Sequence, residues 1–321
     1  MVALMFCSRF APAADTFLAT KDDAYVTHAA SSDVWSIGNG ELVLDIGFDA
    51  GHTLTVRGLS NPVTRRSWDV ATEVDTNLTI EGERVVLADS GATSFLGATA
   101  EETDHGVRLT FTFEHRTRRA RISRIYACYP GSPTIETWTR IDTSNAPDAV
   151  AFTNLTGWTM LMPNAKVKWL GGLRGDAADI EESGAFALAE RDLTPDERVE
   201  IGSDRRSSEQ FVPFALVDDG RDEFFGGIQW SGAWRISFER HEDTLRVTAD
   251  FPHWETLVTP GRPLELPHAF FGVTPRSTTN ESDALRNFII HGVRRGRPLH
   301  PLVTYNTWFA YGARIDEDLI V

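Results

Sequence analysis

The sequence predicts an all-β fold built from two large antiparallel sheets, and three observations lead to this prediction. Short runs rich in β-branched and aromatic residues follow one another from Asp23 to about Val273, with turn residues between them. Many of these runs alternate apolar and polar residues, as a strand with one buried and one solvated face does. The first convincing helical pattern comes only after Glu281. Many half-buried strands bury their apolar faces together when two sheets stack.

Length and composition agree with one large β domain. The 321 residues exceed the ~150 typical of one domain, although all-β sandwiches reach ~250 residues in one piece. Hydrophobic residues make up 41% of the chain, which is enough to bury a sizeable core. We therefore expect the sandwich at about residues 20–280, followed by a shorter segment of another kind.

The first 19 residues are predicted to be a separate leader segment. Apolar Val2–Cys7 precedes Ala11–Ala14, which resembles a small-residue cleavage site. No positive charge precedes the apolar run, and the run is shorter than the ~7–15 residues of a signal core. A signal peptide and a disordered leader both stay open, and so do a periplasmic or secreted location and a cytoplasmic one.

The alternating strand pattern is clearest at Glu41–Phe48 and Val107–Glu114. Further strands are predicted along the chain at Ala120–Tyr129, Thr134–Asp142, Phe211–Val217, Phe224–Trp230, Trp234–Arg240, Leu245–Phe251 and Pro263–Thr274. The acidic stretch Gly175–Ile201 predicts a long surface loop or an insertion, because its charges are best solvated.

A helix is predicted over residues 281–297, and Asn280 or Ser282 can cap its start. The helix should end near Gly296. Its apolar residues recur at helical spacing, namely Ala284, Leu285, Phe288, Ile289 and Val293.

Residues 298–321 are predicted to begin a new unit. Pro298 and Pro301 break the helical pattern, and Leu302–Tyr305 is predicted to be a short strand. Asp316–Val321 has the pattern of a helix that stops partway.

Charge and residue usage exclude several classes of partner. The formal net charge of −15 repels phosphate backbones and anionic headgroups, so neither nucleic acid nor a membrane is an expected partner. No stretch approaches the ~18 apolar residues of a membrane span. Cys7 and Cys128 are the only cysteines, and the nine histidines lack metal-site spacing. No nucleotide-binding glycine motif follows a strand. We therefore expect no metal and no cofactor.

Several motifs occur together in a fixed order along the chain. Phe225–Trp234 contains a strand-turn-strand around Trp230-Ser231-Gly232-Ala233-Trp234. The other segments are Asp33–Gly40, Phe211–Phe214, Thr259–Gly261 with Pro267–Val273, and Leu285–Phe288 with Tyr305–Phe309. In their order and spacing they resemble glycoside hydrolase family 36, the family of microbial α-galactosidases. The resemblance covers roughly residues 30–321 and is weak through Leu54–Arg205.

The resemblance implies a galactose-mutarotase-like β-supersandwich at residues 20–280, a linker helix at 281–297 and the start of a (β/α)₈ catalytic barrel at 298–321. Such a barrel needs ~250 residues, and only 21 run from Pro301 to Val321, which is enough for one strand and part of one helix.

The resemblance also implies an activity, which is retaining hydrolysis of terminal α-galactosides by an aspartate nucleophile and an aspartate acid/base. In the family both aspartates lie on later barrel strands. Retention needs two carboxylates ~5–5.5 Å apart, so we expect the chain alone to be inactive.

Three residues are predicted to contact substrate. Trp308 and Asn306 would follow the first barrel strand, at the rim where barrels place their sites, with an indole to stack on a pyranose and an amide to bond hydroxyls. The alternative packs Trp308 under the rim and uses Asn306 in a turn. Trp68 is the N-terminal candidate for reaching a neighbouring barrel. Trp230 and Trp234 alternate with isoleucines and are predicted to be core.

Other functions stay open beside the hydrolase. A carbohydrate-binding sandwich would bind sugars without cleaving them, and an assembly domain would bury surface between subunits. A strand at Leu302–Tyr305 favours the hydrolase, because a binding module has no use for a strand with an unpaired edge. The expected partners are an α-galactoside oligosaccharide and further copies of the chain in a homo-oligomer. Transferase activity and other α-glycosides also stay open.

Overall fold

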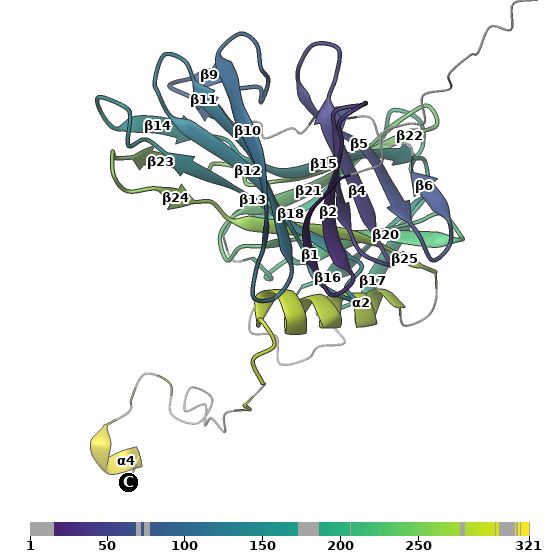
Figure 1. Ribbon diagram of the computed structural model, residues 1–321. Helices are drawn as coiled ribbons and strands as arrows, with labels where there is room; N and C mark the ends of the chain where they lie inside the picture. Colours follow the sequence, from purple (N-terminus) through teal and green to yellow (C-terminus); the bar gives the residue numbers. More distant parts are fainter. Residues whose placement is uncertain are drawn as a thin grey trace, which may run out of the picture.

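The protein is a two-layer β-sandwich with one helix across an outer face (Figure 1). The computed structural model describes residues 16–68, 72–73, 78–172, 186–205, 207–276, 280–298, 300–301, 312, 314 and 316–320. Every strand pairing within this part of the chain is antiparallel, so the predicted all-β antiparallel architecture is confirmed.

The largest sheet has ten strands and forms one complete layer. Its strand order joins residues that lie far apart in the sequence, because β13 pairs with β25 and β25 with β20. The path across the sheet is β10 (Thr93–Glu102), β11 (Val107–His115), β12 (Arg121–Cys128), β13 (Thr134–Asp142), β25 (His268–Pro275), β20 (Asp222–Gln229), β19 (Phe211–Asp218), β16 (Lys166–Gly171) and β17 (Leu188–Arg191), with β24 (Leu264–Glu265) beside β13.

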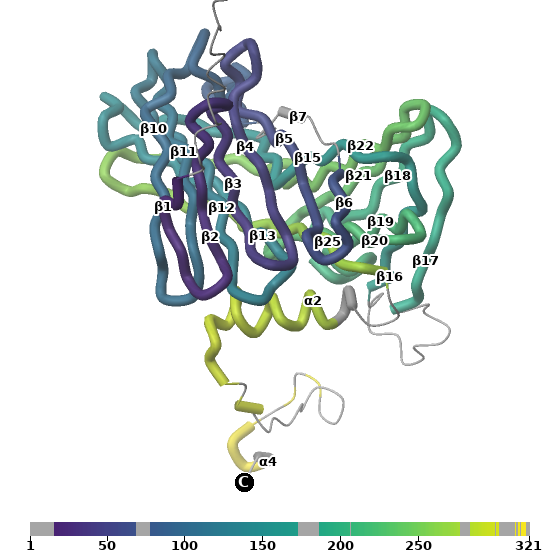
Figure 2. The backbone as a smooth tube through the Cα atoms, turned by 45° about the vertical axis from the view of Figure 1, so that its right-hand side comes forward, coloured from purple at the N-terminus to yellow at the C-terminus, as the bar shows by residue number. Residues whose placement is uncertain are grey.

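The opposite layer begins with a seven-stranded sheet from the N-terminal part of the chain. Its first six strands follow in sequence order, as successive hairpins do, and the seventh pairs with the fifth. They are β1 (Thr16–Lys21), β2 (Ala24–Ala29), β3 (Val34–Gly38), β4 (Val43–Phe48), β5 (Leu54–Asn61), β6 (Arg66–Trp68) and β7 (Thr72–Glu73). In Figure 2 the purple strands β2, β3 and β4 lie in front of β12 and β13. β2 contacts β11, and β3 contacts β12.

Two four-stranded sheets complete the sandwich. The first contains β23 (Glu255–Val258), β14 (Val150–Thr153), β8 (Thr79–Ile80) and β9 (Glu83–Arg84). The second contains β15 (Thr156–Pro163), β22 (Thr244–Asp250), β21 (Trp234–His241) and β18 (Arg198–Ser203). The second sheet extends the layer of the seven-stranded sheet, since β15 contacts β7 on one side and β25 of the large sheet on the other.

Aromatic side chains from both layers interlock in the main core. The ring of Trp35 on β3 meets Phe111 on β11 edge to face, with 5.3 Å between centroids. Trp158 on β15 packs in the same way against Phe224 on β20, at 5.5 Å. Gly226 is required beside this indole, because an added Cβ would overlap the ring of Trp158.

The predicted C-terminal helix is present and covers the outer face of the large sheet. It consists of α2 (Asn280–Phe288), which continues as a π-helical turn η1 (Ile289–Val293). Ala284 and Phe288 are buried in a second core with Ile125, Phe225 and Phe270 of the sheet. The side chains of Asn280 and Ser282 lie outside the described residues, so the predicted cap stays a prediction.

Two sequence predictions are corrected by the strands. The stretch Gly175–Ile201 is not one long loop, because β17 and the first part of β18 lie within it. Their side chains are mostly half-buried or exposed, so these edge strands lack the apolar alternation that would identify them. Trp234 is buried as predicted, whereas Trp230 is 39% exposed because the strand ends at Gln229.

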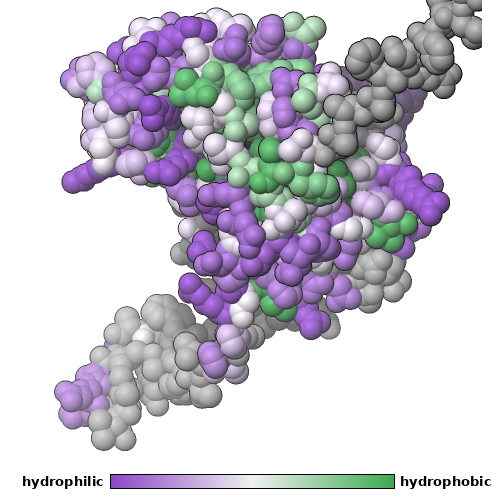
Figure 3. Space-filling view, in the orientation of Figure 1, coloured by the Kyte–Doolittle hydropathy of each residue, from purple (hydrophilic) through white to green (hydrophobic). Residues whose placement is uncertain are grey.

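The end of the chain is described only in part. A short helix α4 (Glu317–Ile320) lies within the predicted Asp316–Val321 segment, and the predicted strand Leu302–Tyr305 falls outside the described residues. None of the helices in the described part is long and apolar enough to cross a membrane. Figure 3 shows that hydrophilic side chains surround smaller hydrophobic patches on the viewed face of the molecule.

Candidate functional site

The outer face of the ten-stranded sheet carries the candidate site. Strand alternation sends Ile135 and Ile141 of β13 into the main core, and therefore turns Glu136 and Trp138 to the opposite face. A sheet face without a second layer is normally solvated. Here Glu136 and Trp138 are nevertheless buried, with 6% and 5% of their surfaces exposed.

Glu136 lies at the centre of a buried hydrogen-bond network. Its Oε1 accepts a bond from the amide of Gln229 at 3.0 Å and contacts Nδ1 of His268 at 2.7 Å. Its Oε2 accepts the hydroxyl hydrogen of Tyr129. The other ring nitrogen of His268 contacts Glu265 at 3.1 Å. β13 pairs with β25, and β25 pairs in turn with β20, which brings these groups together.

The network shifts the pKa values of its members in opposite directions. Burial alone would raise the pKa of Glu136, but hydrogen bonds from His268 and Tyr129 outweigh it and lower that pKa. Burial alone would lower the pKa of His268, whereas the bond to Glu136 and its negative charge raise it. Burial, followed by the charge of Glu136, raises the pKa of Tyr129. Both shifts favour the state in which Glu136 is negatively charged and His268 is positively charged.

The ring of His268 stacks on the indole of Trp138. The two ring planes differ by 7° and their centroids lie 4.3 Å apart. The guanidinium carbon of Arg108 lies 5.5 Å from the same indole. Trp138 and His268 come from the paired strands β13 and β25, and Arg108 comes from β11, which β12 separates from β13. The three side chains form one layer of flat groups.

A pocket of about 410 Å³ opens beside this layer. The sheet supplies its floor, and the β10–β11 turn and the segment Gly292–Arg295 supply its walls. Gly292 permits this approach, because an added Cβ would come within 2.8 Å of the Tyr129 ring and 2.9 Å of Phe288. The complete lining is Thr103, Asp104, His105, Arg108, Ala127, Tyr129, Glu136, Trp138, Gln229, Glu265, His268, Gly292, Val293 and Arg295.

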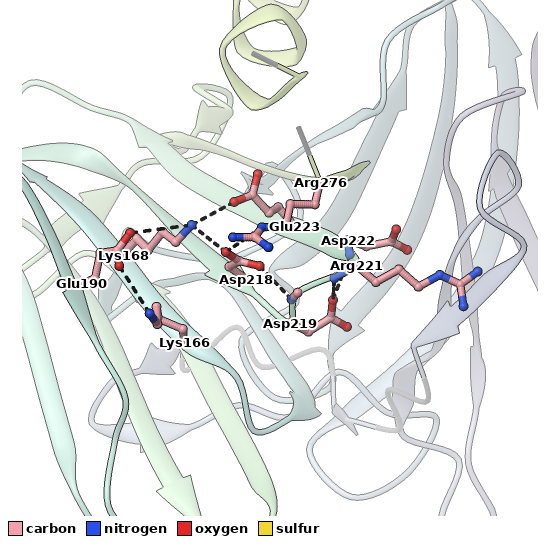
Figure 4. A network of polar contacts seen from close by, with 10 residues as sticks. Lys166, Lys168, Glu190, Asp218, Asp219, Arg221, Asp222, Glu223 and Arg276 are labelled. Carbon is pink, nitrogen blue, oxygen red and sulfur yellow. Dashed lines mark hydrogen bonds and ion pairs between the residues drawn. The ribbon is translucent and has the colours of Figure 1, made fainter. Parts of the chain in front are cut away.

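A second charged cluster lies near the other end of the same sheet (Figure 4). Nζ of Lys168 lies 2.7 Å from Asp218 and 3.1 Å from Glu223, and Nε of Arg276 lies 3.2 Å from Asp218. Glu190 lies 3.9 Å from Nζ of the same lysine, so three carboxylates surround Lys168, and Arg276 adds a second cation. This cluster ties β16, β19 and β20 to the segment that leads into α2, which is a structural role.

The structure places the three predicted substrate contacts as follows. Trp308 and Asn306 lie outside the described residues, so their roles stay predictions. Trp68 is corrected, because it is 1% exposed and the guanidinium of Arg66 lies 4.2 Å from its ring centre. A buried indole has no face left for a sugar of another subunit. Trp68 is a core residue.

Sequence reasoning did not identify Glu136, Trp138 and His268 as a site. Glu136 and Trp138 lie two residues apart on one predicted strand, so their side chains share one face of the sheet. This shared face was the signal in the sequence that could have identified the site. His268 is 132 residues from Glu136, and strand order alone brings them together. Within the described residues, no group of three or more His, Cys, Asp or Glu side chains could hold a metal ion.

Comparison with known proteins gives matches to solved structures only. No family model matches the sequence, and no curated protein matches it. The α-galactosidase from Lactobacillus brevis is similar with a TM-score of 0.68 and 12% identity, over 91% of this chain and 46% of that one. The galactosidase domain of the α-galactosidase-sucrose kinase AgaSK is similar with a TM-score of 0.66 and 11% identity, over 82% and 44%.

A third match is a variant of the family 36 α-galactosidase AgaA from Geobacillus stearothermophilus, in complex with stachyose. Its TM-score is 0.66 at 13% identity, over 89% of this chain and 47% of that one. The chain thus spans less than half the length of these proteins. It shares the fold of that portion of family 36 α-galactosidases.

Proposed function

We propose that this chain forms the N-terminal β-sandwich of a retaining α-galactosidase-like glycoside hydrolase. The supporting observation is that its fold matches α-galactosidases over most of its own length and less than half of theirs. Five motifs in family order, from Asp33–Gly40 to Tyr305–Phe309, support the same assignment. A fold alone does not define an activity, so the assignment remains a proposal about the longer enzyme.

The proposed enzyme cleaves terminal α-galactosides in two steps. A carboxylate attacks the anomeric carbon while a second carboxylic acid protonates the leaving oxygen, and water then releases galactose from the covalent intermediate. We place both aspartates in a barrel beyond residue 321. The sandwich and helix α2 would support that barrel, and the sandwich would also mediate contacts between subunits.

The hydrogen bonds of Glu136 support the proposal that glycoside hydrolysis takes place outside the pocket on the sheet face. Attack on a sugar requires a carboxylate oxygen that is free to approach the anomeric carbon. Both oxygens of Glu136 accept hydrogen bonds from His268, Gln229 and Tyr129. Glu136 is therefore a poor nucleophile, and it organises the sheet face instead.

The stereochemistry of the reaction tests the proposed function. A protein extended downstream of Val321 is expected to release galactose from an aryl α-galactoside with the α-anomer formed first, as proton NMR during the first minutes would record. Initial formation of the β-anomer would contradict the retaining mechanism. Absence of any galactose release would contradict the hydrolase assignment.

We further propose that Trp308 and Asn306 contact the sugar in the extended enzyme. Loss of an indole that stacks on galactose removes ~0.5–1.5 kcal/mol, which corresponds to a roughly two- to tenfold lower kcat/KM. Trp308→Ala should show this decrease in the same reaction while its melting temperature is unchanged. A lower melting temperature with unchanged kcat/KM would instead identify Trp308 as a packing residue.

A further inference from the structure

We propose that the pocket between the outer face of the large sheet and the turn η1 is a saccharide-binding site, which holds one or two neutral sugar residues. The site lies on the sandwich itself, and the structure describes all the residues that line it. It binds sugar without cleaving it.

The size of the pocket fits a small ligand. Its volume of about 410 Å³ lies at the lower end of the ~300–1,000 Å³ typical of small-molecule sites. The floor is preformed, because Glu136 and Trp138 are buried and fixed by contacts with His268, Gln229 and Tyr129. A rigid floor lowers the entropy lost when a ligand binds.

The lining combines donors and acceptors without an excess of either charge. Arg108 and Arg295 provide cationic donors, while Asp104 and Glu265 provide anionic acceptors, and Glu136 is paired with His268. These carboxylates would repel a phosphate, and the guanidinium groups would repel a free cation. A neutral molecule with many hydroxyls can bond to both kinds of group at once. Arg108 is itself paired with Glu101 at 3.0 Å, so the lining does not present an unpaired cluster of cations. This balance favours a neutral ligand with many hydroxyls over a phosphate or a metal cation.

The helical turn provides a second, independent observation. α2 does not end regularly but continues as the π-helical turn Ile289–Val293, and such turns occur frequently at functional sites. The turn brings Gly292 against Tyr129 and places Val293 at the pocket, where it is 47% exposed. The wider turn therefore forms one wall of the pocket.

The stacking geometry predicts weak binding. His268 and Arg108 already contact the indole of Trp138, so a sugar ring gains hydrogen bonds at the pocket rim rather than a full stacking contact. We therefore expect dissociation constants in the millimolar range.

Calorimetric titration of the 321-residue chain with galactose, raffinose and stachyose tests the proposal. Saturable binding of at least one of these sugars is expected. Val293→Trp should weaken it at least tenfold by filling the pocket. Ile289→Trp is the matched control, because Ile289 is 43% exposed on the same turn and does not line the pocket, so binding should be unchanged.

Two results would overturn the proposal. One is no saturable binding of any of the three sugars up to about 100 mM, well above the millimolar range. The other is equal binding by the wild type and Val293→Trp, which would place the sugar elsewhere. Neither result bears on the hydrolase proposal, because that proposal is tested on the extended protein.

Discussion

Single residues on the outer sheet face show how a carboxylate is kept buried in this protein. Burial of a charged group costs free energy unless hydrogen bonds replace the lost water. Glu136 meets this condition with Gln229, Tyr129 and His268, which come from β20, the segment after β12, and β25. Removing one partner would leave the carboxylate unsatisfied in a buried position. We therefore expect Glu136 to couple the central strands.

The pH dependence of stability tests the Glu136–His268 pair. The pKa of His268 is raised, so its contribution to the unfolding free energy is complete below pH ~6.5 and disappears as the pH rises through the raised pKa. The pKa of Glu136 is lowered, so its contribution is complete above pH ~4.3 and disappears as the pH falls through the lowered pKa. The pair should therefore stabilise the fold most between these limits.

The corresponding measurement is urea unfolding of the wild type and His268→Ala from pH 4 to 9. At pH 6 the unfolding free energy of the variant should be about 2 kcal/mol lower than that of the wild type, as for the loss of a hydrogen bond to a charged group. This difference in unfolding free energy should become smaller as the pH rises toward 9. His241→Ala removes an exposed His–Asp contact and should change little. A difference between His268→Ala and wild type that is constant with pH would contradict the ion pair.

Among the elements, α2 is the one that links the sandwich to the C-terminal part of the chain. Phe288 is buried, with 4.9 Å between its ring centroid and that of Phe270 and 6.2 Å to that of Tyr129. Short helices are marginal in water by themselves. The stability of α2 therefore comes from this apolar contact with the sheet.

Truncation of Phe288 should release the helix. Phe288→Ala is expected to cost about 3–5 kcal/mol of docking free energy, as for other buried phenylalanines. Limited proteolysis should then cleave within residues 280–293 faster than in the wild type, while the far-ultraviolet signal of the sheets persists. Ile289→Ala, which truncates an exposed neighbour, should leave the cleavage rate unchanged. Equal protection of both variants would show that α2 is held in another way.

The strands differ in how well the sequence predicts them. Val107–His115 and Thr134–Asp142 were predicted almost residue for residue, because alternation reports a buried face directly. β17 and β18 were missed because edge strands bury little and their charges resemble those of a loop. The pocket could not be predicted, because no local pattern reveals that β13 pairs with β25.

At the scale of the whole molecule, the two layers serve different purposes. The seven-stranded sheet and the sheet of β15, β22, β21 and β18 close the main core from one side. The ten-stranded sheet contributes to that core with one face and carries α2, the polar pocket and the charged cluster around Lys168 on the other. This outer face is therefore where we expect contacts with sugar and with the barrel.

The most direct test of the central proposal compares galactose release from an aryl α-galactoside by two purified proteins, the 321-residue chain and the product extended downstream of Val321. We predict that the extended protein releases galactose. The 321-residue chain should release no more than a mock preparation, because the catalytic aspartates are proposed to lie beyond it. Release by the 321-residue chain at a rate comparable to that of the extended protein would contradict this account.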